Sequence, residues 1–323
     1  RIALMMYIMY LFFCKKFMQA NKSFAVYEVR MKILITGAGG FVGRNVKEYL
    51  ERQKKYKIYA PASKELDCTD EAAVTEYLRQ HCFDCVLHFA VYGNEIDKEK
   101  DGSRILDYNL RIFLNFAKNN EYYGKMFYAG SGAEYDKRYD ISRVTEGEIG
   151  KTIPVDQYGL MKYTVGQMIE NSKNIFNLRL FGIFGKYEYY PVKFISNVCC
   201  KAIKGVPLTM RQNVYFDYLW VEDFCRMVEF FLNNEPQYHT YNMVSGQRIS
   251  LLEICERVLE ISGKKLPVFI CREGLAREYT AQNHRFMQEC QDFVYTPIGR
   301  AIEGLYHWYL TREEEIDLYK LLY

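Results

Sequence analysis

The chain has 323 residues, 43 of them basic and 40 acidic, and a formal net charge of +3. This balance, with no basic block, argues against nucleic acid as the main partner. Ten cysteines are scattered without the spacing of a disulfide framework, which favours reduced thiols and a cytoplasmic protein. Cys82 and Cys85 form half of a zinc or redox motif that no second pair completes, so no metal site is expected.

The first thirty residues differ from the rest of the chain. Ile2–Phe13 is apolar and is followed by two lysines, but it is shorter than the about 20 residues that span a membrane. The charges follow the apolar run, and no small-residue cleavage site is present, which is the wrong order for a secretory signal. We expect 1–30 to be an extension outside the functional domain, without stable membrane insertion, and a peripheral membrane contact is the alternative.

The stretch Lys32–Gly43, KILITGAGGFVG, predicts a strand, a tight turn and a helix in succession. Its apolar run is typical of a buried parallel strand, and three glycines at three-residue spacing suit a backbone that closely approaches a pyrophosphate. The predicted helix, Phe41–Arg52, would direct free N–H groups at that pyrophosphate. The cofactor-binding residues predicted in this stretch are Gly37, Gly40, Phe41, Val42 and Gly43.

The residues after a second predicted strand, Lys57–Ala60, bear on the choice of cofactor. NAD-binding proteins place an acidic side chain there, which binds the ribose 2′-hydroxyl. This sequence has Ser63 and Lys64 instead. A hydroxyl and an ammonium suit a 2′-phosphate better than a diol, so NADP is favoured and NAD is the second choice. Two acidic residues, Asp67 and Asp70, then precede a predicted helix, Glu71–Gln80, and either could cap it.

Strand and helix continue to alternate along the chain. The next predicted elements are a strand at Cys85–Phe89, a helix at about Ser103–Asn119 and a strand at Lys125–Ala129. Such alternation predicts parallel strands with right-handed crossovers, the doubly wound sheet of an α/β fold. Ligands bind outside the carboxyl ends of such strands. Gly37, Ala90 and Ser131 all follow predicted carboxyl ends, so we expect them to line one crevice.

Tyr158 and Lys162 lie one turn apart on a predicted helix that runs to about Asn171. Their spacing places the phenol and the ammonium on one helix face. The ammonium favours the phenolate, which lets Tyr158 donate and accept a proton near neutral pH. Because the chain holds 29 tyrosines, the pair gains its weight from position, one helix after the strand that ends near Ser131.

Together these motifs resemble those of the extended short-chain dehydrogenases/reductases, a family of nucleotide-sugar epimerases, dehydratases and reductases. The resemblance covers nearly all of Met31–Tyr323. It implies a Rossmann domain at 31–180, to which later segments return, and a smaller mixed α/β substrate domain at 181–323. It also implies an enzyme that binds NAD(P) and a nucleotide-sugar substrate.

The resemblance further implies a role for each matching residue. Tyr158 would be the general acid/base, Lys162 would bind the nicotinamide ribose, and Ser131 would hydrogen-bond the substrate oxygen. Asp67 would hold the adenine amine, and Asn109 would support the site from a neighbouring helix. The helices that carry Asn109 and Tyr158 resemble those that form four-helix dimer contacts in the family, which leaves a homodimer open.

The later part of the chain departs from the family at Phe216, where an arginine commonly contacts the nucleotide diphosphate. The candidate substitutes for this arginine are Arg211, Arg248 and Arg285. Tyr187 is a further candidate for substrate contact. A capping box at Ser250–Glu253 predicts a helix to about Ile261, and Thr296–Pro297 begins a last packed helix that runs to Tyr309.

The residues beside Ser131 favour one class of reaction. The 4,6-dehydratases of the family carry an Asp-Glu pair directly after the serine or threonine, whereas this chain has Gly132 and Ala133, with Glu134 one place later where it should point elsewhere. GDP-fucose synthases of the family use a cysteine and a histidine where Ala133 and Tyr187 stand. The minimal set that remains supports a 4-keto reductase that uses NADPH. A 4-epimerase that keeps NAD bound is the alternative, and a cofactor-binding regulator without catalysis is the third interpretation.

Overall fold

The computed structural model describes residues 30–93 and 102–322. The expected extension, 1–30, and its apolar run therefore lie outside the described residues, apart from Arg30. Within 30–93 and 102–322, no helix is long and apolar enough to cross a membrane.

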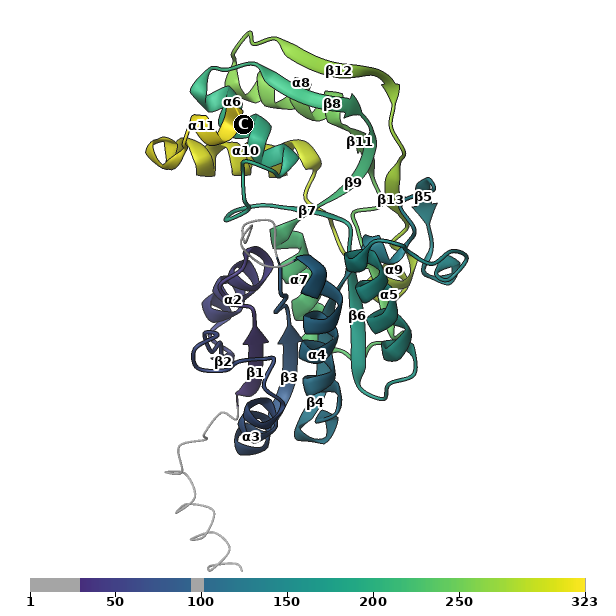
Figure 1. Cartoon of the computed structure of the whole chain (residues 1–323). Helices are drawn as coiled ribbons and strands as arrows, with labels where there is room; N and C mark the ends of the chain where they lie inside the picture. The colour runs from purple at the N-terminus through teal and green to yellow at the C-terminus, as the bar shows by residue number, and fades with distance from the viewer. Residues whose placement is uncertain (1–29, 94–101, 323) are drawn as a thin grey trace, which may run out of the picture. The chain divides into compact units, whose positions relative to one another are not determined.

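A six-stranded sheet with the order β10-β6-β4-β3-β1-β2 forms the base of the fold (Figure 1). Its strands are β1 (Met31–Thr36), β2 (Tyr56–Tyr59), β3 (Phe83–His88), β4 (Tyr123–Ser131), β6 (Ile175–Leu180) and β10 (Thr240–Met243). The pairs from β1 through β3, β4 and β6 to β10 are all parallel. This arrangement confirms the expected doubly wound sheet, and β10 is a segment from late in the chain that returns to it.

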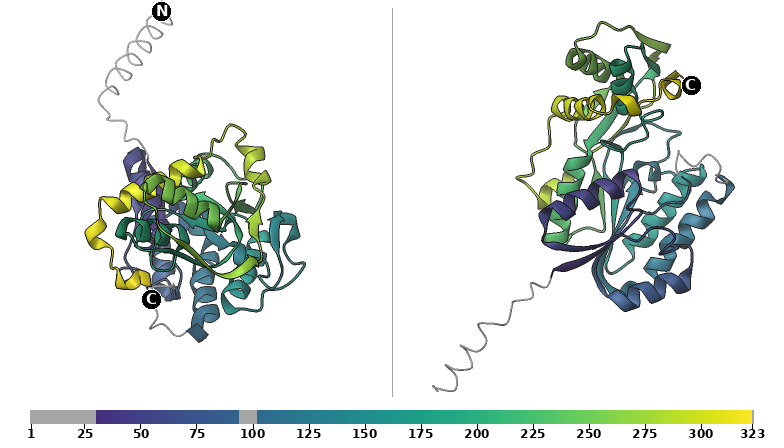
Figure 2. Two further views of the ribbon diagram at one scale, coloured as in Figure 1. Left: turned by 90° about the horizontal axis from the view of Figure 1, so that it is seen from above. Right: turned by 90° about the vertical axis from the view of Figure 1, so that its left-hand side faces the viewer.

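Helices cover both faces of this sheet. The helices α2 (Phe41–Gln53) and α7 (Val221–Asn233) pack on one face, and α3 (Glu71–His81), α4 (Ile105–Ala117) and α5 (Gln157–Glu170) pack on the other, as the right-hand view of Figure 2 shows. In β1, the side chains of Ile33, Leu34 and Ile35 are all buried, because alternate side chains of a strand face opposite helical layers. Leu34 packs into the core formed with α3, α4 and α5. Coverage on both faces explains why the first strand is continuously apolar.

Most elements lie within one or two residues of their predicted limits, and two of them differ at both ends by two residues. The helix expected at Ser103–Asn119 begins with a 3-10 turn at Gly102–Arg104 and is α-helical from Ile105 to Ala117. The strand expected at Lys125–Ala129 is longer, because its ladders continue at both ends, with Tyr123 opposite Phe83 and Ser131 opposite Leu180. Ser131 is therefore the last residue of β4 rather than the residue after it.

The remaining strands form two smaller sheets. The first contains β11 (Arg248–Ser250), β9 (Tyr215–Trp220), β13 (Tyr279–Ala281) and β5 (Ile141–Val144), with β7 (Gly182–Phe184) paired to β9; the second pairs β12 (Val268–Leu275) with β8 (Leu208–Asn213). The pair of β11 and β9 is antiparallel, whereas β13 runs parallel to both β9 and β5. The expected mixed α/β part is confirmed.

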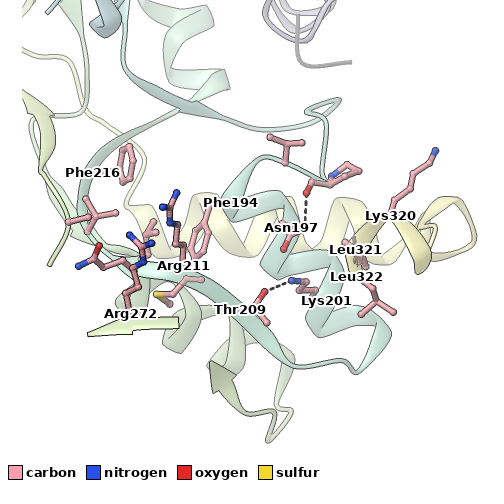
Figure 3. A pocket seen from close by; sticks show the side chains of 17 residues that line it. Phe194, Asn197, Lys201, Thr209, Arg211, Phe216, Arg272, Lys320, Leu321 and Leu322 are labelled. Atoms are coloured by element: carbon pink, nitrogen blue, oxygen red, sulfur yellow. Dashed lines mark hydrogen bonds between the residues drawn. The ribbon is translucent and has the colours of Figure 1, made fainter. Parts of the chain in front are cut away.

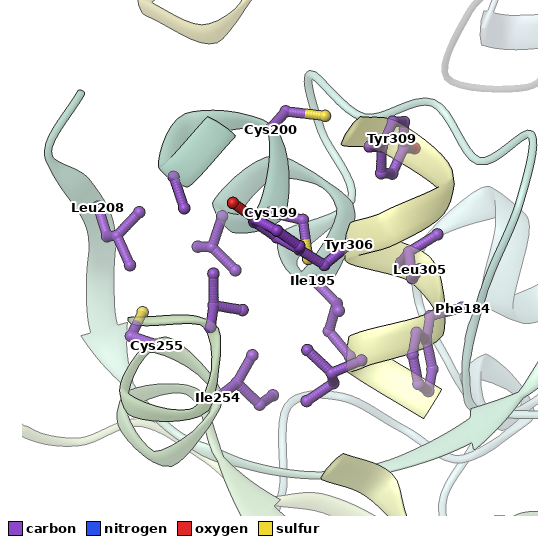
Figure 4. Packing of buried hydrophobic residues seen from close by; sticks show 14 of the residues in the cluster. Phe184, Ile195, Cys199, Cys200, Leu208, Ile254, Cys255, Leu305, Tyr306 and Tyr309 are labelled. Atoms are coloured by element: carbon purple, nitrogen blue, oxygen red, sulfur yellow. The ribbon is translucent and has the colours of Figure 1, made fainter. Parts of the chain in front are cut away.

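A second core lies among α6 (Phe194–Lys204), α8 (Leu251–Ser262) and α10 (Ile298–Leu310), as Figure 4 shows. Cys199 and Cys200 are both buried on α6. The predicted capping box of α8 is also present, since the Ser250 hydroxyl accepts from the Glu253 N–H at 3.2 Å. The other short helices are α9 (His284–Glu289), α11 (Tyr319–Leu322) and 3-10 turns at Asn120–Tyr122, Gly132–Glu134, Glu146–Glu148 and Glu313–Glu315.

Candidate active site

The glycine turn after β1 is shaped by close backbone contacts. Gly37 has a φ of +67°, and a Cβ there would lie 2.7 Å from the backbone nitrogen of Ala90, just after β3. A Cβ on Gly43 would lie 2.8 Å from the carbonyl carbon of Gly37. In the sheet, β2 lies on one side of β1 and β3 lies on the other, so the strand order reverses between β1 and β3. The contact of Gly37 with Ala90 therefore lies at the topological switch point, where α/β sheets bind ligands.

The N-terminus of α2 lies directly on this turn. Its N-cap residue, Gly40, is extended and supplies no side-chain cap, and the first helical turn has no acidic residue. The N–H groups at Phe41 and Val42 thus belong to an uncapped helix start, which attracts anions. A cradle that has no room for a Cβ and ends at free N–H groups fits a dinucleotide pyrophosphate.

The residues predicted for the adenosine end follow β2. Ser63 and Lys64 are exposed in the turn closed by the hydrogen bond from Glu65 N to Ala62 O. Asp67 accepts hydrogen bonds from the N–H and hydroxyl of Thr69 at 2.8 and 2.7 Å. Asp70 caps α3 by accepting from Ala73 N, which is the ordinary role expected of one acid of this pair.

Asn109 holds the loop that follows β3. Its side-chain oxygen accepts from Tyr92 N at 2.8 Å and its amide donates to Tyr92 O at 3.0 Å. A little earlier in the same loop, Ala90 N donates to the hydroxyl of Thr36 at 3.2 Å. These bonds attach the loop to both α4 and β1, so Asn109 is placed to support the crevice rather than to react in it.

Ser131 lies at the carboxyl end of β4 and begins a 3-10 turn. Its hydroxyl accepts from Ala133 N at 3.1 Å, and its own N–H donates to the Glu134 carboxylate at 3.0 Å. Glu134 is fully buried, where it pairs with Arg179 at 2.8 Å and accepts from the amide of Asn177. The expectation that Glu134 points elsewhere is confirmed, because its carboxylate is turned into the protein.

Tyr158 and Lys162 lie on the first turns of α5, which Asp156 caps by accepting from Gly159 N at 2.8 Å. The ammonium nitrogen of Lys162 is 5.8 Å from the centre of the Tyr158 ring. Burial lowers the pKa of Lys162 to about 8, and the nearby charge of Glu134 opposes that shift. A positive charge next to the phenol is the arrangement that stabilises a phenolate.

The sequence analysis missed Tyr279, which belongs to β13. Its hydroxyl lies against Gly132, next to Ser131, and burial followed by the proximity of Tyr158 raises the pKa of this phenol. A Cβ on Gly132 would collide with the same hydroxyl. No local pattern marks Tyr279, because the contact joins segments that are far apart in the sequence.

A cavity of about 710 Å³ lies between α6, the pair of β8 and β12, and α11 (Figure 3). None of its lining residues is acidic, while the cations that line it are Lys201, Arg211, Arg272 and Lys320. Lys201 is 6 % exposed and donates to the Thr209 hydroxyl at 2.6 Å. Lys320 is within 4.0 Å of the Asp317 carboxylate, so the cavity carries an excess of positive charge, which favours an anionic ligand.

Phe216, which stands where the family resemblance implies an arginine, connects this cavity to the region around Ser131. Phe216 lines the cavity, and its ring centre is 5.7 Å from that of Tyr279, whose hydroxyl lies against Gly132, next to Ser131. Of the candidate arginines, Arg211 lines the cavity. The sequence analysis missed Arg272, which β12 places opposite Gln212 of β8. Only strand pairing brings these two guanidinium-bearing segments together.

The other candidate substrate residues lie outside this cavity lining. The guanidinium of Arg248 lies 3.8 Å from the centre of the Tyr215 ring. It also forms an ion pair with Glu278, the residue directly before β13. Arg285 of α9 donates to the carbonyl of Thr240. Tyr187 donates its hydroxyl to Glu48 of α2 at 3.1 Å, and the guanidinium of Arg44 lies 3.5 Å from its ring centre.

The doubly wound sheet, its uncapped glycine turn and the adjacent Tyr158 and Lys162 define a Rossmann-type dinucleotide-binding protein. The sequence model of the NAD dependent epimerase/dehydratase family matches residues 33–243, and the chain belongs to this family. The family predicted from the motifs, and its dependence on a nicotinamide dinucleotide, are confirmed.

Individual relatives and structures are also similar to this chain. GDP-L-colitose synthase of Yersinia pseudotuberculosis is 27% identical over 262 residues, which cover 73% of this chain and 83% of that protein. A GDP-L-fucose synthetase structure from Naegleria fowleri has a TM-score of 0.76 at 16% identity and covers 88% of this chain and 94% of its own. The GDP-mannoheptose C4 reductase from Campylobacter jejuni with NADP bound has a TM-score of 0.74 at 16% identity, covering 87% and 98%.

Proposed function

We propose that this protein reduces a keto group of a nucleotide-linked sugar, most favourably at C4, with NADPH as the hydride donor. The observation that carries the proposal is the set of groups at the end of β4. Ser131, Tyr158 and Lys162 come from neighbouring elements, and the two positions after Ser131 carry no acid or base. This set supports hydride transfer coupled to a single proton transfer.

When bound, the nicotinamide supplies a hydride to the keto carbon. The Ser131 hydroxyl would hydrogen-bond the carbonyl oxygen, and Tyr158 would give that oxygen a proton as the carbonyl becomes an alcohol. The ammonium of Lys162 would stabilise the phenolate that remains on Tyr158. One hydride and one proton convert the ketone to the alcohol, so no further acid or base is required.

Elimination and carbanion epimerisation are less well supported by the side chains present. A dehydratase needs an acid and a base beside the serine, but position 132 is glycine and Glu134 is paired with Arg179. Epimerisation next to a ketone needs two further groups, and Tyr187 instead donates its hydroxyl to Glu48. The reductase reaction requires neither set.

The cationic cavity supports a nucleoside diphosphate as the part of the substrate that is bound but stays unchanged in the reaction. Arg211 and Arg272 would bind the diphosphate oxygens, and the ring of Phe216 would separate the diphosphate from the sugar near Tyr279. All three of the similar proteins described above are named for GDP-linked sugars: a synthase, a synthetase and a C4 reductase. GDP-linked 4-keto sugars are therefore the first substrates to test.

NADP is proposed over NAD for two reasons. Ser63 and Lys64 are exposed where a 2′-phosphate would need a hydroxyl and a cation. The similar C4 reductase structure holds NADP. A cytoplasmic setting belongs to the same proposal, because every cysteine in the described residues is a free thiol.

The deciding experiment is NADPH consumption with a panel of nucleotide-linked 4-keto sugars. The wild-type protein should oxidise NADPH with at least one of them, and Tyr158→Phe should lose turnover by a factor of at least about 100 while it still binds NADPH. Tyr163→Phe, on the same helix, is the matched control and should keep its activity. Full activity in Tyr158→Phe would overturn the proton transfer.

The second candidate is a 4-epimerase, which needs the same three residues and a tightly bound NAD. Protein that releases stoichiometric NAD on denaturation and interconverts two nucleotide sugars without net NADPH use would favour it. A regulator without catalysis would instead show stabilisation by NADP(H) and no turnover on any substrate of the panel.

We also propose that two copies pair through α4 and α5. Met168 of α5 is an apolar side chain that is 41 % exposed, and a second copy packed on this helix would cover it. Light scattering of the purified protein should give the mass of a dimer, and Met168→Glu should shift it to a monomer. A monomeric wild-type protein would reject this pairing.

A further inference from the structure

The ammonium of Lys162 is buried without an ion-pair partner among the described residues. Its Nζ donates to the Tyr128 hydroxyl at 2.9 Å and to the Ala129 carbonyl at 2.6 Å, both on β4. Lys162 as a whole is only 5 % exposed. A buried cation with no carboxylate beside it depends on neutral acceptors for its charge, because burial disfavours the ionised form.

Tyr128 is well suited to be such an acceptor. Burial raises the pKa of its phenol well above the usual value, so the hydroxyl stays neutral and its oxygen is available to Lys162. The ammonium also lies 4.4 Å from the centre of the Tyr128 ring, within the range of a cation–π interaction. Phe113 meets the same ring edge-on at 5.4 Å between centres and helps to fix its plane.

The titratable groups that face Lys162 come from four elements. They are Tyr128 on β4, Tyr158 on its own helix, Glu134 in the 3-10 turn after β4 and His88 on β3. Burial, and then the charge of Lys162, lower the pKa of His88 to about 3, so this ring is neutral at physiological pH. Glu134 acts on Lys162 from beyond ion-pair distance, because its carboxylate is paired with Arg179.

We propose that Tyr128 is a positioning residue that keeps Lys162 protonated and holds its ammonium at the cofactor edge of the sheet. An ammonium has three N–H donors, and β4 takes two of them. The third has no protein partner among the described residues and is left for a ribose hydroxyl. The effect of Tyr128 on turnover rests on the proposed function, whereas its effect on the protonation of Lys162 does not.

The test is the pKa of Lys162 in Tyr128→Phe, which keeps the ring and removes the hydroxyl. The ring contact survives, so the change isolates one hydrogen bond to a charged group. We expect the pKa to fall by about one unit from its wild-type value near 8, the shift that corresponds to losing such a bond. NMR titration of ¹³Cε-labelled lysines measures it, with the signal assigned by its loss in Lys162→Arg.

Tyr123→Phe is the matched control. Tyr123 also lies on β4 and is 5 % exposed, and its hydroxyl donates to the Phe116 carbonyl at 3.0 Å rather than to Lys162. This variant should leave the pKa of Lys162 unchanged. Equal pKa values in the two variants, both folded by circular dichroism, would overturn the role of Tyr128. If Tyr128→Phe does not fold, Tyr128→Met removes the same oxygen with a side chain that adapts to irregular gaps.

Binding of NADPH, followed by its fluorescence across the same pH range, gives a second readout. The alkaline loss of affinity should move to lower pH in Tyr128→Phe by the same interval as the pKa. A shifted pKa in a protein that turns over no substrate would overturn only the proposed reductase function. An unshifted pKa in an active enzyme would overturn only the inference about Tyr128.

Discussion

Tyr279 places its phenol oxygen in the space into which any side chain at Gly132 would project. The ring of Phe181 closes the same space, because its nearest atom would lie 2.7 Å from a Cβ at this position. In the 4,6-dehydratases of the family, the residue after the serine or threonine is an acid. Here the phenol of Tyr279, from β13, fills that side of Ser131. The absence of the acid and the presence of Tyr279 are two aspects of one packing arrangement.

Substitution of Gly132 tests this arrangement. Gly132→Ala should lower the free energy of unfolding by about 1–3 kcal/mol, the usual effect of overpacking, and should reduce kcat/KM by displacing Ser131 or Tyr279. Urea unfolding and steady-state kinetics measure the two effects. Gly147→Ala is the control, because a Cβ at Gly147 meets no atom within 4 Å.

The double variant Gly132→Ala with Tyr279→Phe should recover part of the lost stability. It removes the phenol oxygen from the shared space, although Phe181 remains close. If Gly132→Ala is as stable as Gly147→Ala, the two residues do not compete for this space in solution.

The cavity makes a prediction about substrate affinity. Arg272→Gln removes one of its cations and should raise KM for a nucleotide sugar by about 10- to 100-fold, the equivalent of one or two charge-assisted hydrogen bonds, with a small effect on kcat. Arg248→Gln is the matched control, since Arg248 stacks on Tyr215 outside the cavity lining. A rise in KM for Arg248→Gln and none for Arg272→Gln would place the nucleotide elsewhere.

Glu134 is predicted to act in stability rather than in catalysis. Its ion pair with Arg179 is buried, with side-chain exposures of 0% and 2%. Glu134→Gln leaves the guanidinium uncompensated and should lower the free energy of unfolding by about 3–5 kcal/mol. Thermal and urea unfolding measure this loss. A stable Glu134→Gln enzyme with a lowered kcat would instead identify Glu134 as an acid or base of the reaction.

The lowered pKa of Lys162 predicts how activity and stability change at alkaline pH. Its pKa of about 8 means that the ammonium is present below that pH and is lost as the pH rises through it, so kcat/KM should fall with a midpoint near 8. Stability should respond in the opposite direction. An unfolded lysine still binds a proton between about pH 8 and 10.5, so unfolding becomes less favourable as the pH rises through this window.

Lys162→Met should remove both pH effects. It should abolish the rise in stability above pH 8, which urea titrations at pH 7, 8.5 and 10 would reveal. A stability curve identical to that of the wild type would mean that folding does not lower the pKa of Lys162.

Much of the fold was accessible from local patterns. The run KILITGAGGFVG predicted β1, its turn and α2, because a buried strand, a crowded turn and an uncapped helix each select their residues locally. The capping box at Ser250 and Glu253 predicted the start of α8 for the same reason. Element limits were less accessible, and Ser131 proved to be paired with Leu180 inside the ladder, since register depends on the neighbouring strands.

The sequence by itself determined the family, the parallel sheet and the spacing of Tyr158 and Lys162 on one helix face, because these follow from short-range periodicity. Only the tertiary structure decided which of the many tyrosines and cations lie at the site. Tyr279 reaches Gly132 next to Ser131, Tyr128 reaches Lys162, and Arg272 joins Arg211 through contacts between distant segments. A side chain's chemistry is the same wherever it occurs in the chain, and only packing brings a particular one within hydrogen-bonding distance of another.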